Sequence, residues 1–397
     1  MSKHFNLMEF LRKAPNELLQ LYCEREGILG GFAWEQRKQT DAEKIATALA
    51  AEGKGVTDRV KIHFRMLWDI SGRGFTHGAL NEAKFWGDDE AATTIKQLKS
   101  HLAKAFWTTL ERPNFVKNAK ILSAVDALPD GAWVKRGGLP ARPGPVDEAV
   151  VASLEASLVE FFTRTEYRGD YCKIDAIRRG GEEIFHAYAA DHPDSDMFWR
   201  GSQLEAQVFN PSIRLIFKHD DVRRTLDIHV SDDRRKIPVL QQLFARAVLA
   251  EEIPEVDPSD SPIYRIDHVL ENGFEFEYSP DLGIADVRVV KARFVLEGEP
   301  WRRFLVEADN AKVRNALTAL VDQLTQELRK VRPRLRLDQI HLKVAFVKQP
   351  DERRGKIRDC IITDPNVLRL KKDDLGEKIE AMLMQSGIEC SDEDEAS

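Results

Sequence analysis

The chain has 397 residues, of which 43% are hydrophobic and 31% are charged, and its formal net charge at pH 7 is −7. This length exceeds one ordinary hydrophobic core, so we expect a folded protein of two or three domains. The acidic balance excludes a surface coated in basic residues, although a local basic stripe is compatible with it. No apolar run approaches the ~20 residues that span a bilayer, so we expect no membrane segment.

The cysteines and the N-terminus indicate a compartment. No apolar segment follows Lys3, so a secretory signal is not expected. The chain has four cysteines with neither C-x-x-C nor zinc spacing, and they are Cys23, Cys172, Cys360 and Cys390. This pattern favours reduced thiols in a cytoplasmic protein, without a metal site and without a cofactor.

Residues 1–127 are predicted to form an all-α domain. Apolar side chains recur at helical spacing, as in the series Val60, Phe64, Leu67 and Trp68. Acidic residues open the segment after Gly87, where the helix dipole favours them. By usual helix lengths, the domain should hold roughly five or six helices.

Residues 128–147 are predicted to be a linker. Four prolines and four glycines fall within 128–146. No helix and no central strand is expected in such a composition.

The hydrophobic period then changes from 3.6 to 2, which predicts an α+β unit over 148–252. A helix after Asp147 is followed by strands that alternate around the turn at 178–181. A second strand pair occupies 212–230, and a helix follows from Ile237 to Ala250.

A second α+β unit is predicted over 253–388, with its boundary placed in the Pro-, Asp- and Ser-rich segment 251–264. Strands are expected at 274–278, 284–298, 301–308, 337–348 and 355–363. A long helix should begin at Asp309 or Asn310, and a final helix should stop at Gly387. The acidic tail 389–397 is expected to be disordered. Internal duplication and convergence both explain the shared strand–turn–helix order after Arg223 and Arg302.

The predicted fold class is therefore α+β: an all-helical N-terminal domain followed by one or two mixed α+β units with mainly antiparallel sheet.

The common catalytic motifs are absent from the sequence. We find no P-loop, no G-x-G-x-x-G after a strand, no H-E-x-x-H and no G-x-S-x-G. The glycines of 71–78 are interpreted as a flexible turn between two helices. Our first hypothesis is therefore a non-enzymatic adaptor, sensor or regulatory subunit that acts through protein–protein contacts, in an oligomeric state that the sequence does not give.

A sheet edge in the first α+β unit carries the candidate catalytic residues His186, Asp227 and His229. Asp227 and His229 are two residues apart on one predicted strand, so their side chains should point the same way. Carboxylates and imidazoles at one edge could bind Mg²⁺ or Mn²⁺ for phosphodiester hydrolysis. The alternative is a solvated hairpin, whose turn charges Arg178, Arg179, Glu182 and Glu183 would be exposed.

Two arginine-rich segments, 329–336 and 351–358, raise a third hypothesis, that of nucleic-acid binding. Several cations on one surface would bind a phosphate backbone, although the same cations can also offset a helix dipole. The candidate residues are Arg329, Lys330, Arg332, Arg334, Arg336, Arg353, Arg354, Lys356 and Arg358.

Overall fold

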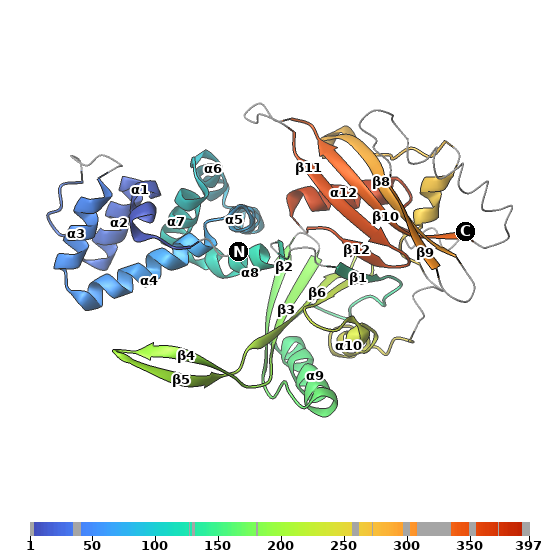
Figure 1. Cartoon of the computed structure of the whole chain (residues 1–397), viewed down its shortest axis with the longest axis horizontal. Coiled ribbons are helices and arrows are strands. Elements are labelled where there is room, and N and C mark those ends of the chain that lie inside the picture. Colours follow the sequence, from blue (N-terminus) through green and yellow to red (C-terminus); the bar gives the residue numbers. More distant parts are fainter. Residues whose placement is uncertain are drawn as a thin grey trace. The chain divides into compact units, whose positions relative to one another are not determined.

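The computed structural model describes residues 4–34, 41–126, 128, 132–179, 182–255, 262–271, 273–296, 302–307, 335–348, 355–371 and 373–390. The chain divides into two compact units, Met1–Leu128 and Pro129–Ser397. The first is helical and the second combines helices with antiparallel sheet (Figure 1), which confirms the predicted α+β class.

The helical unit is held together by an aromatic core. Phe10 and Phe64 stack with ring centroids 4.4 Å apart, and Tyr22 and Phe106 pack around them. Side-chain caps start two of its helices, because Asp88 accepts from the Ala91 N–H and Ser100 from the Ala103 N–H. Its helices are α1 (Leu7–Lys13), α2 (Asn16–Glu26), α3 (Ala42–Ala51), α4 (Lys54–Ile70), α5 (Arg73–Phe85), α6 (Asp89–Gln97), α7 (His101–Glu111) and α8 (Pro113–Asp126).

Of the glycines of 71–78, Gly72 lies between two helices as predicted, but the other two do not. Gly74 and Gly78 lie inside α5, and a Cβ on Gly78 would come within 2.8 Å of the Ala119 Cα of α8. These glycines therefore let two helices pack closely, which is why a helix tolerates them here.

The second unit is built on one long sheet. Its ten strands in the described residues follow the order β2-β3-β6-β7-β1-β12-β11-β10-β8-β9, and every neighbouring pair is antiparallel. The strands are β1 (Ala132–Arg136), β2 (Cys172–Arg179), β3 (Glu182–Ala190), β6 (Ser212–Asp220), β7 (Thr225–Val230), β8 (Ile284–Leu296), β9 (Arg302–Glu307), β10 (Leu335–Phe346), β11 (Ile357–Thr363) and β12 (Val367–Arg369). The helices are α9 (Glu148–Glu166), α10 (Ile237–Phe244) with a π-helical turn at Ala245–Leu249, and α12 (Asp374–Gln385).

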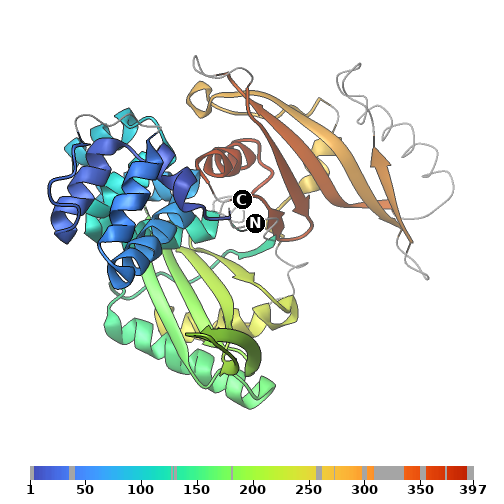
Figure 2. The same cartoon turned by 60° about the vertical axis from the view of Figure 1, so that its left-hand side comes forward.

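The two halves of this sheet bury opposite faces. Phe217 and Ile228 pack against α9 and α10, which lie along one side of β2, β3, β6 and β7 (Figure 2). Leu368 and Ile362 pack against α12. Because side chains alternate along a strand, the register through Trp133 on β1 places Leu368 on the face opposite Ile228.

Several predicted boundaries are wrong. Ala132–Arg136 forms a central strand inside the predicted linker, since the prolines and glycines flank this stretch without entering it. Residues 274–278 form no strand, and β12 precedes the final helix. Glu389, assigned to the disordered tail, is 4% exposed and forms an ion pair with Lys135. The predicted helix that begins at Asp309 or Asn310 lies outside the described residues.

Candidate functional site

A two-stranded ribbon extends from the second unit, between β3 and β6 (Figure 1). Strands β4 (Asp194–Arg200) and β5 (Gln203–Phe209) pair only with each other among the described residues, and all of their residues are exposed. Gly201 supplies the positive φ of 65° in the turn that joins them. We call this ribbon, residues 194–209, the arm.

The arm is amphipathic. The register pairs Ser195 with Val208, Met197 with Ala206 and Trp199 with Leu204, and alternation puts all six side chains on one face. The other face holds the remaining polar side chains together with two phenylalanines, namely Asp194, Asp196, Phe198, Arg200, Gln203, Glu205, Gln207 and Phe209. One face is thus free of charged groups, and the other carries all of the arm's charges.

The apolar face is open to solvent. Trp199 is 71% exposed and Val208 is 70% exposed, while Met197 and Leu204 are each about half exposed. An isolated two-stranded hairpin is marginally stable in water. Contiguous exposed apolar surface marks sites of interaction. The arm therefore has the chemistry of a contact surface.

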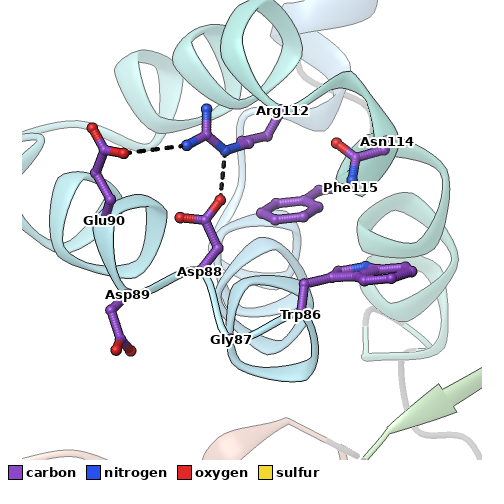
Figure 3. A pocket seen from close by; sticks show the side chains of 8 residues that line it. All are labelled: Trp86, Gly87, Asp88, Asp89, Glu90, Arg112, Asn114 and Phe115. Atoms are coloured by element: carbon purple, nitrogen blue, oxygen red, sulfur yellow. Dashed lines mark hydrogen bonds and ion pairs between the residues drawn. The ribbon is translucent and has the colours of Figure 1, made fainter.

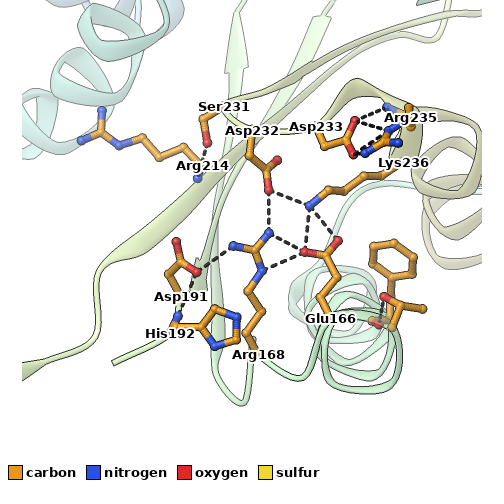
Figure 4. Close-up of polar contacts among 12 residues, drawn as sticks. Glu166, Arg168, Asp191, His192, Arg214, Ser231, Asp232, Asp233, Arg235 and Lys236 are labelled. Carbon is orange, nitrogen blue, oxygen red and sulfur yellow. Dashed lines mark hydrogen bonds and ion pairs between the residues drawn. The ribbon is translucent and has the colours of Figure 1, made fainter. Parts of the chain in front are cut away.

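The base of the arm is anchored by an ion-pair network (Figure 4). Arg168 donates to Asp191 Oδ1 at 2.7 Å, to Asp232 Oδ2 at 2.6 Å and, through Nε, to Glu166 Oε2 at 2.8 Å. Lys236 Nζ bridges the same Asp232 and Glu166 at 2.6 and 2.7 Å. The network thereby connects the end of α9, the segment that leads into the arm and the segment after β7.

Electrostatics and backbone bonds both hold Asp191 in place. Burial opposes its ionisation, but hydrogen bonds from Arg168 and from the His192 N–H hold the pKa of its carboxyl below the usual range. The Asp191 N–H donates to the Pro211 carbonyl at 2.7 Å, and Asn210 Nδ2 donates to the Asp191 carbonyl. The segment that enters the arm and the segment that leaves it are therefore hydrogen-bonded to each other at its base.

The structure places the candidate catalytic residues His186, Asp227 and His229 on one sheet face but does not join them. His186 on β3 and His229 on β7 are both in register with Ile216 of β6. Because β6 lies between their strands, the backbones of the two histidines are about 10 Å apart. Asp227 lies opposite Lys135, with which it forms an ion pair at 3.9 Å. The described part of the chain contains no cluster of three His, Cys, Asp or Glu side chains suited to a metal ion.

His186 is a buried neutral imidazole. Its side chain stacks on Tyr188, and the Tyr188 hydroxyl lies 3.1 Å from its Nδ1. Burial is the main cause that lowers the pKa of His186 to about 4, and Arg214 adds to it. The His229 ring packs 5.5 Å from the Trp133 ring. Both histidines thus have packing roles in the sheet.

Beside Asp227 lies a buried charge network that the sequence did not reveal. Lys135 Nζ is 2.5 Å from Glu389 Oε1, and Lys218 Nζ is 2.7 Å from Glu182 Oε1 and 3.7 Å from Glu380 Oε2. Burial alone would lower the pKa of Lys135, but Asp227 and Glu389 together hold it well above its usual value. Lys135 thus links β1 to Glu389 in the C-terminal segment, and Lys218 links β6 to Glu380 of α12.

The hairpin interpretation expected the turn charges between β2 and β3 to be exposed, but two of the glutamates are not exposed. Glu183 is 8% exposed and pairs with Arg142, and Glu182 pairs with Lys218. Partners from distant segments cover them, which local alternation could not indicate. Arg178 is exposed as predicted, and nothing is described of the Arg179 side chain.

The arginine-rich segments fall largely outside the described residues, which exclude Arg329, Lys330, Arg332, Arg334, Arg353 and Arg354. Arg336 forms an ion pair with Asp364, and Arg358 forms one with Asp373 at 2.5 Å. Lys356 is partly exposed next to β11. The two described arginines are thus already bound to carboxylates of the chain.

A pocket of about 620 Å³ lies in the helical unit (Figure 3). Arg112 Nε donates to Asp88 Oδ2 at 2.6 Å inside it, and its guanidinium lies over the Trp107 ring. The lining residues are Trp86, Gly87, Asp88, Asp89, Glu90, Arg112, Asn114 and Phe115. Arg112 is already paired with Asp88 and Glu90, so its guanidinium is less accessible to a ligand. We therefore regard the arm as the stronger candidate site.

The arm could have been found in the sequence. Residues 194–209 alternate around Gly201 and Ser202, which is a hairpin signal of two central residues. We predicted no strand between the hairpin around 178–181 and the strand pair at 212–230. Among the described residues, no helix has both the length and the apolar composition needed to cross a bilayer. Comparisons with protein-family models and with curated proteins find no match.

Proposed function

We propose that this protein is a non-enzymatic binding protein that works through protein–protein contacts, and that the apolar face of the arm is its contact surface. One observation carries the proposal: Met197, Trp199, Leu204 and Val208 lie on one uncharged face and are exposed to solvent. Water disfavours such a face, so covering it with another protein would be favourable.

The charges of the arm favour a protein as its partner. The ribbon carries three carboxylates, on Asp194, Asp196 and Glu205, against one guanidinium, on Arg200. A phosphate backbone or an anionic lipid surface would be repelled by this balance. An uncharged face rimmed by acidic groups is suited instead to another apolar protein surface.

The anchor of the arm supports the same proposal. Arg168 ties Asp191 to α9 and to Asp232, so the orientation of the ribbon is set before binding. A surface that is ordered in advance loses less conformational entropy on association. Tryptophan and methionine are also enriched at interfaces, and both stand on the apolar face.

A photo-crosslinking pair tests the proposal. A photoreactive residue at Val208 points from the apolar face, and the same residue at Gln207 points from the polar face of the same strand. We expect protein crosslinks from position 208 and few from position 207, and the added change Trp199→Ser should abolish those from 208. Equal crosslinking from both positions, or no dependence on Trp199, would contradict the proposed function.

A further inference from the structure

We infer that Met197 is a site of oxidation by hydroperoxides, and that its sulfoxide weakens binding through the apolar face of the arm. The inference rests on the proposed function, because it concerns the regulation of the same surface. A thioether reacts with a peroxide without first losing a proton, so no neighbouring base is required at the site.

Met197 occupies the centre of the apolar face. On β4 it lies between Ser195 and Trp199, whose side chains share its face, and its register partner on β5 is Ala206. The side chain of Met197 is 51% exposed, and the short side chain of Ala206 cannot cover its sulfur. A partner that covers the face must therefore contact Met197.

Few other sulfur atoms among the described residues are as open to an oxidant. Cysteine is oxidised through its thiolate, and burial raises the pKa of Cys23 and that of Cys172 to about 12. The thioether of Met382 is fully buried, whereas Met66 on α4 is 43% exposed. A peroxide should therefore reach Met197 and Met66 before it reaches the buried sulfur atoms.

The oxidation balances with the peroxide as its only co-reactant. With hydrogen peroxide, the sulfur of Met197 attacks one oxygen, so that an S–O bond forms as the O–O bond breaks. The proton on the transferred oxygen passes to the departing hydroxide, which leaves as water. The sulfur loses two electrons, and these reduce the peroxide. A sulfoxide reductase reverses the change, since two thiols become a disulfide while the sulfoxide oxygen leaves as water.

The sulfoxide changes the chemistry of the face. It adds a polar oxygen at the centre of a surface whose side chains carry no charge. An apolar partner surface removes that oxygen from water without supplying a hydrogen-bond donor. We therefore expect oxidation to weaken binding about tenfold, which is a typical cost of burying an unpaired polar group.

Binding and oxidation oppose each other in this account. A partner on the apolar face shields the sulfur of Met197, and the sulfoxide disfavours the partner, as thermodynamic linkage requires. Oxidation therefore acts on the free chain and keeps it from binding.

Peroxide treatment of the dilute purified chain tests the site itself. Peptide mass spectrometry should find sulfoxide at Met197 and at Met66 at similar rates, and at the buried Met382 at least about tenfold more slowly. A far-UV spectrum before and after treatment verifies that the fold is retained. Oxidation of Met197 that is no faster than that of Met382 would overturn the inference.

Photo-crosslinking in cells from the probe at Val208 tests the consequence for binding. Met197→Leu keeps an apolar side chain of similar volume without the sulfur, so its crosslinks should be retained. Met197→Gln places an amide on the face and should lower the yield of crosslinks several-fold, as the sulfoxide does. Peroxide added to the cells should lower the yield from the chain that retains Met197 but not from Met197→Leu. Met66→Gln is the matched control, and its crosslinks should be unchanged.

The two proposals fail differently. Crosslinks from position 208 that are equally strong in Met197→Leu and Met197→Gln would overturn the inference about oxidation and leave the proposed function standing. The same holds if peroxide lowers the crosslinks equally with and without Met197. An absence of protein crosslinks from position 208 in every variant would overturn both.

Discussion

Trp199 on β4 and Leu204 on β5 are register partners at the tip of the arm, and both project from one face, with 71% and 48% of their surface exposed. They contribute little to the core of the unit, since the whole ribbon is exposed. A large apolar pair in this position is best explained by contacts outside the folded chain.

Trp199→Ser should therefore leave the free energy of unfolding unchanged to within about 0.5 kcal/mol, as exposed substitutions do. Phe217→Ala is the control, because Phe217 is fully buried and such a truncation costs about 3–5 kcal/mol. Urea unfolding at low protein concentration measures both. A loss with Trp199→Ser as large as that of the control would mean that the tryptophan serves the fold.

Arg168→Gln should loosen the base of the arm, because it removes the cation shared by Glu166, Asp191 and Asp232. We expect faster limited proteolysis within 191–211, with cleavage sites identified by mass spectrometry. Arg164→Gln is the matched control, because Arg164 lies four residues earlier, in the last turn of α9, is 77% exposed and pairs locally with Glu160. Equal cleavage rates in the two variants would exclude an anchoring role for Arg168.

Lys135→Met should destabilise the second unit by about 3–5 kcal/mol, because it leaves the buried carboxylates of Asp227 and Glu389 without their cation. Lys173→Met removes a lysine whose side chain is 75% exposed, so its unfolding midpoint should match that of the unmodified chain. Denaturant unfolding compares the two. If Lys135→Met left the free energy of unfolding unchanged, the buried network would add nothing to stability.

His186 should make the fold sensitive to mild acid. Burial lowers the pKa of His186 to about 4 in the folded chain, whereas an unfolded histidine titrates near 6.5. The unfolded state therefore binds more protons between these values, so stability is lost as the pH falls from about 6.5 to about 4. This loss should amount to about 2–3 kcal/mol.

His186→Gln isolates this contribution. The variant cannot bind the proton, so its free energy of unfolding should fall less between pH 7 and pH 4.5 than that of the unmodified chain. Urea unfolding at the two pH values gives the comparison, in which the carboxylates common to both proteins cancel. Identical pH dependence would show that His186 is already protonatable in the fold.

The sequence predicts the elements of this fold better than their partners. Helical periodicity predicted a helical first unit, although we expected roughly five or six helices and the described residues form eight, α1 to α8. Alternation located β2, β3, β6, β7, β8, β10 and β11. The central place of β1 could not be predicted, because Trp133 pairs with Leu368, more than 200 residues away in the chain. Long-range register is not encoded in a local pattern.

The candidate site shows the same limit. Alternation correctly put Asp227 and His229 on one face, but it could not show that Lys135 binds Asp227. The arm was missed for a different reason. Its hairpin signal at Gly201 is local, yet the acidic residues Asp194 and Asp196 made its start resemble a solvated loop. We gave the polarity of these side chains more weight than the alternation around Gly201. In the structure the polar residues Asp194 and Asp196 nevertheless belong to strand β4.

Oxidative footprinting in cells that produce the protein tests the central claim most directly. Met197 on the arm and Met66 on α4 are 51% and 43% exposed, so hydroxyl radicals should oxidise both at similar rates in dilute purified protein. If another protein covers the apolar face, Met197 should be protected in the cell while Met66 is oxidised as before. Equal oxidation of the two methionines in the cell would contradict the account.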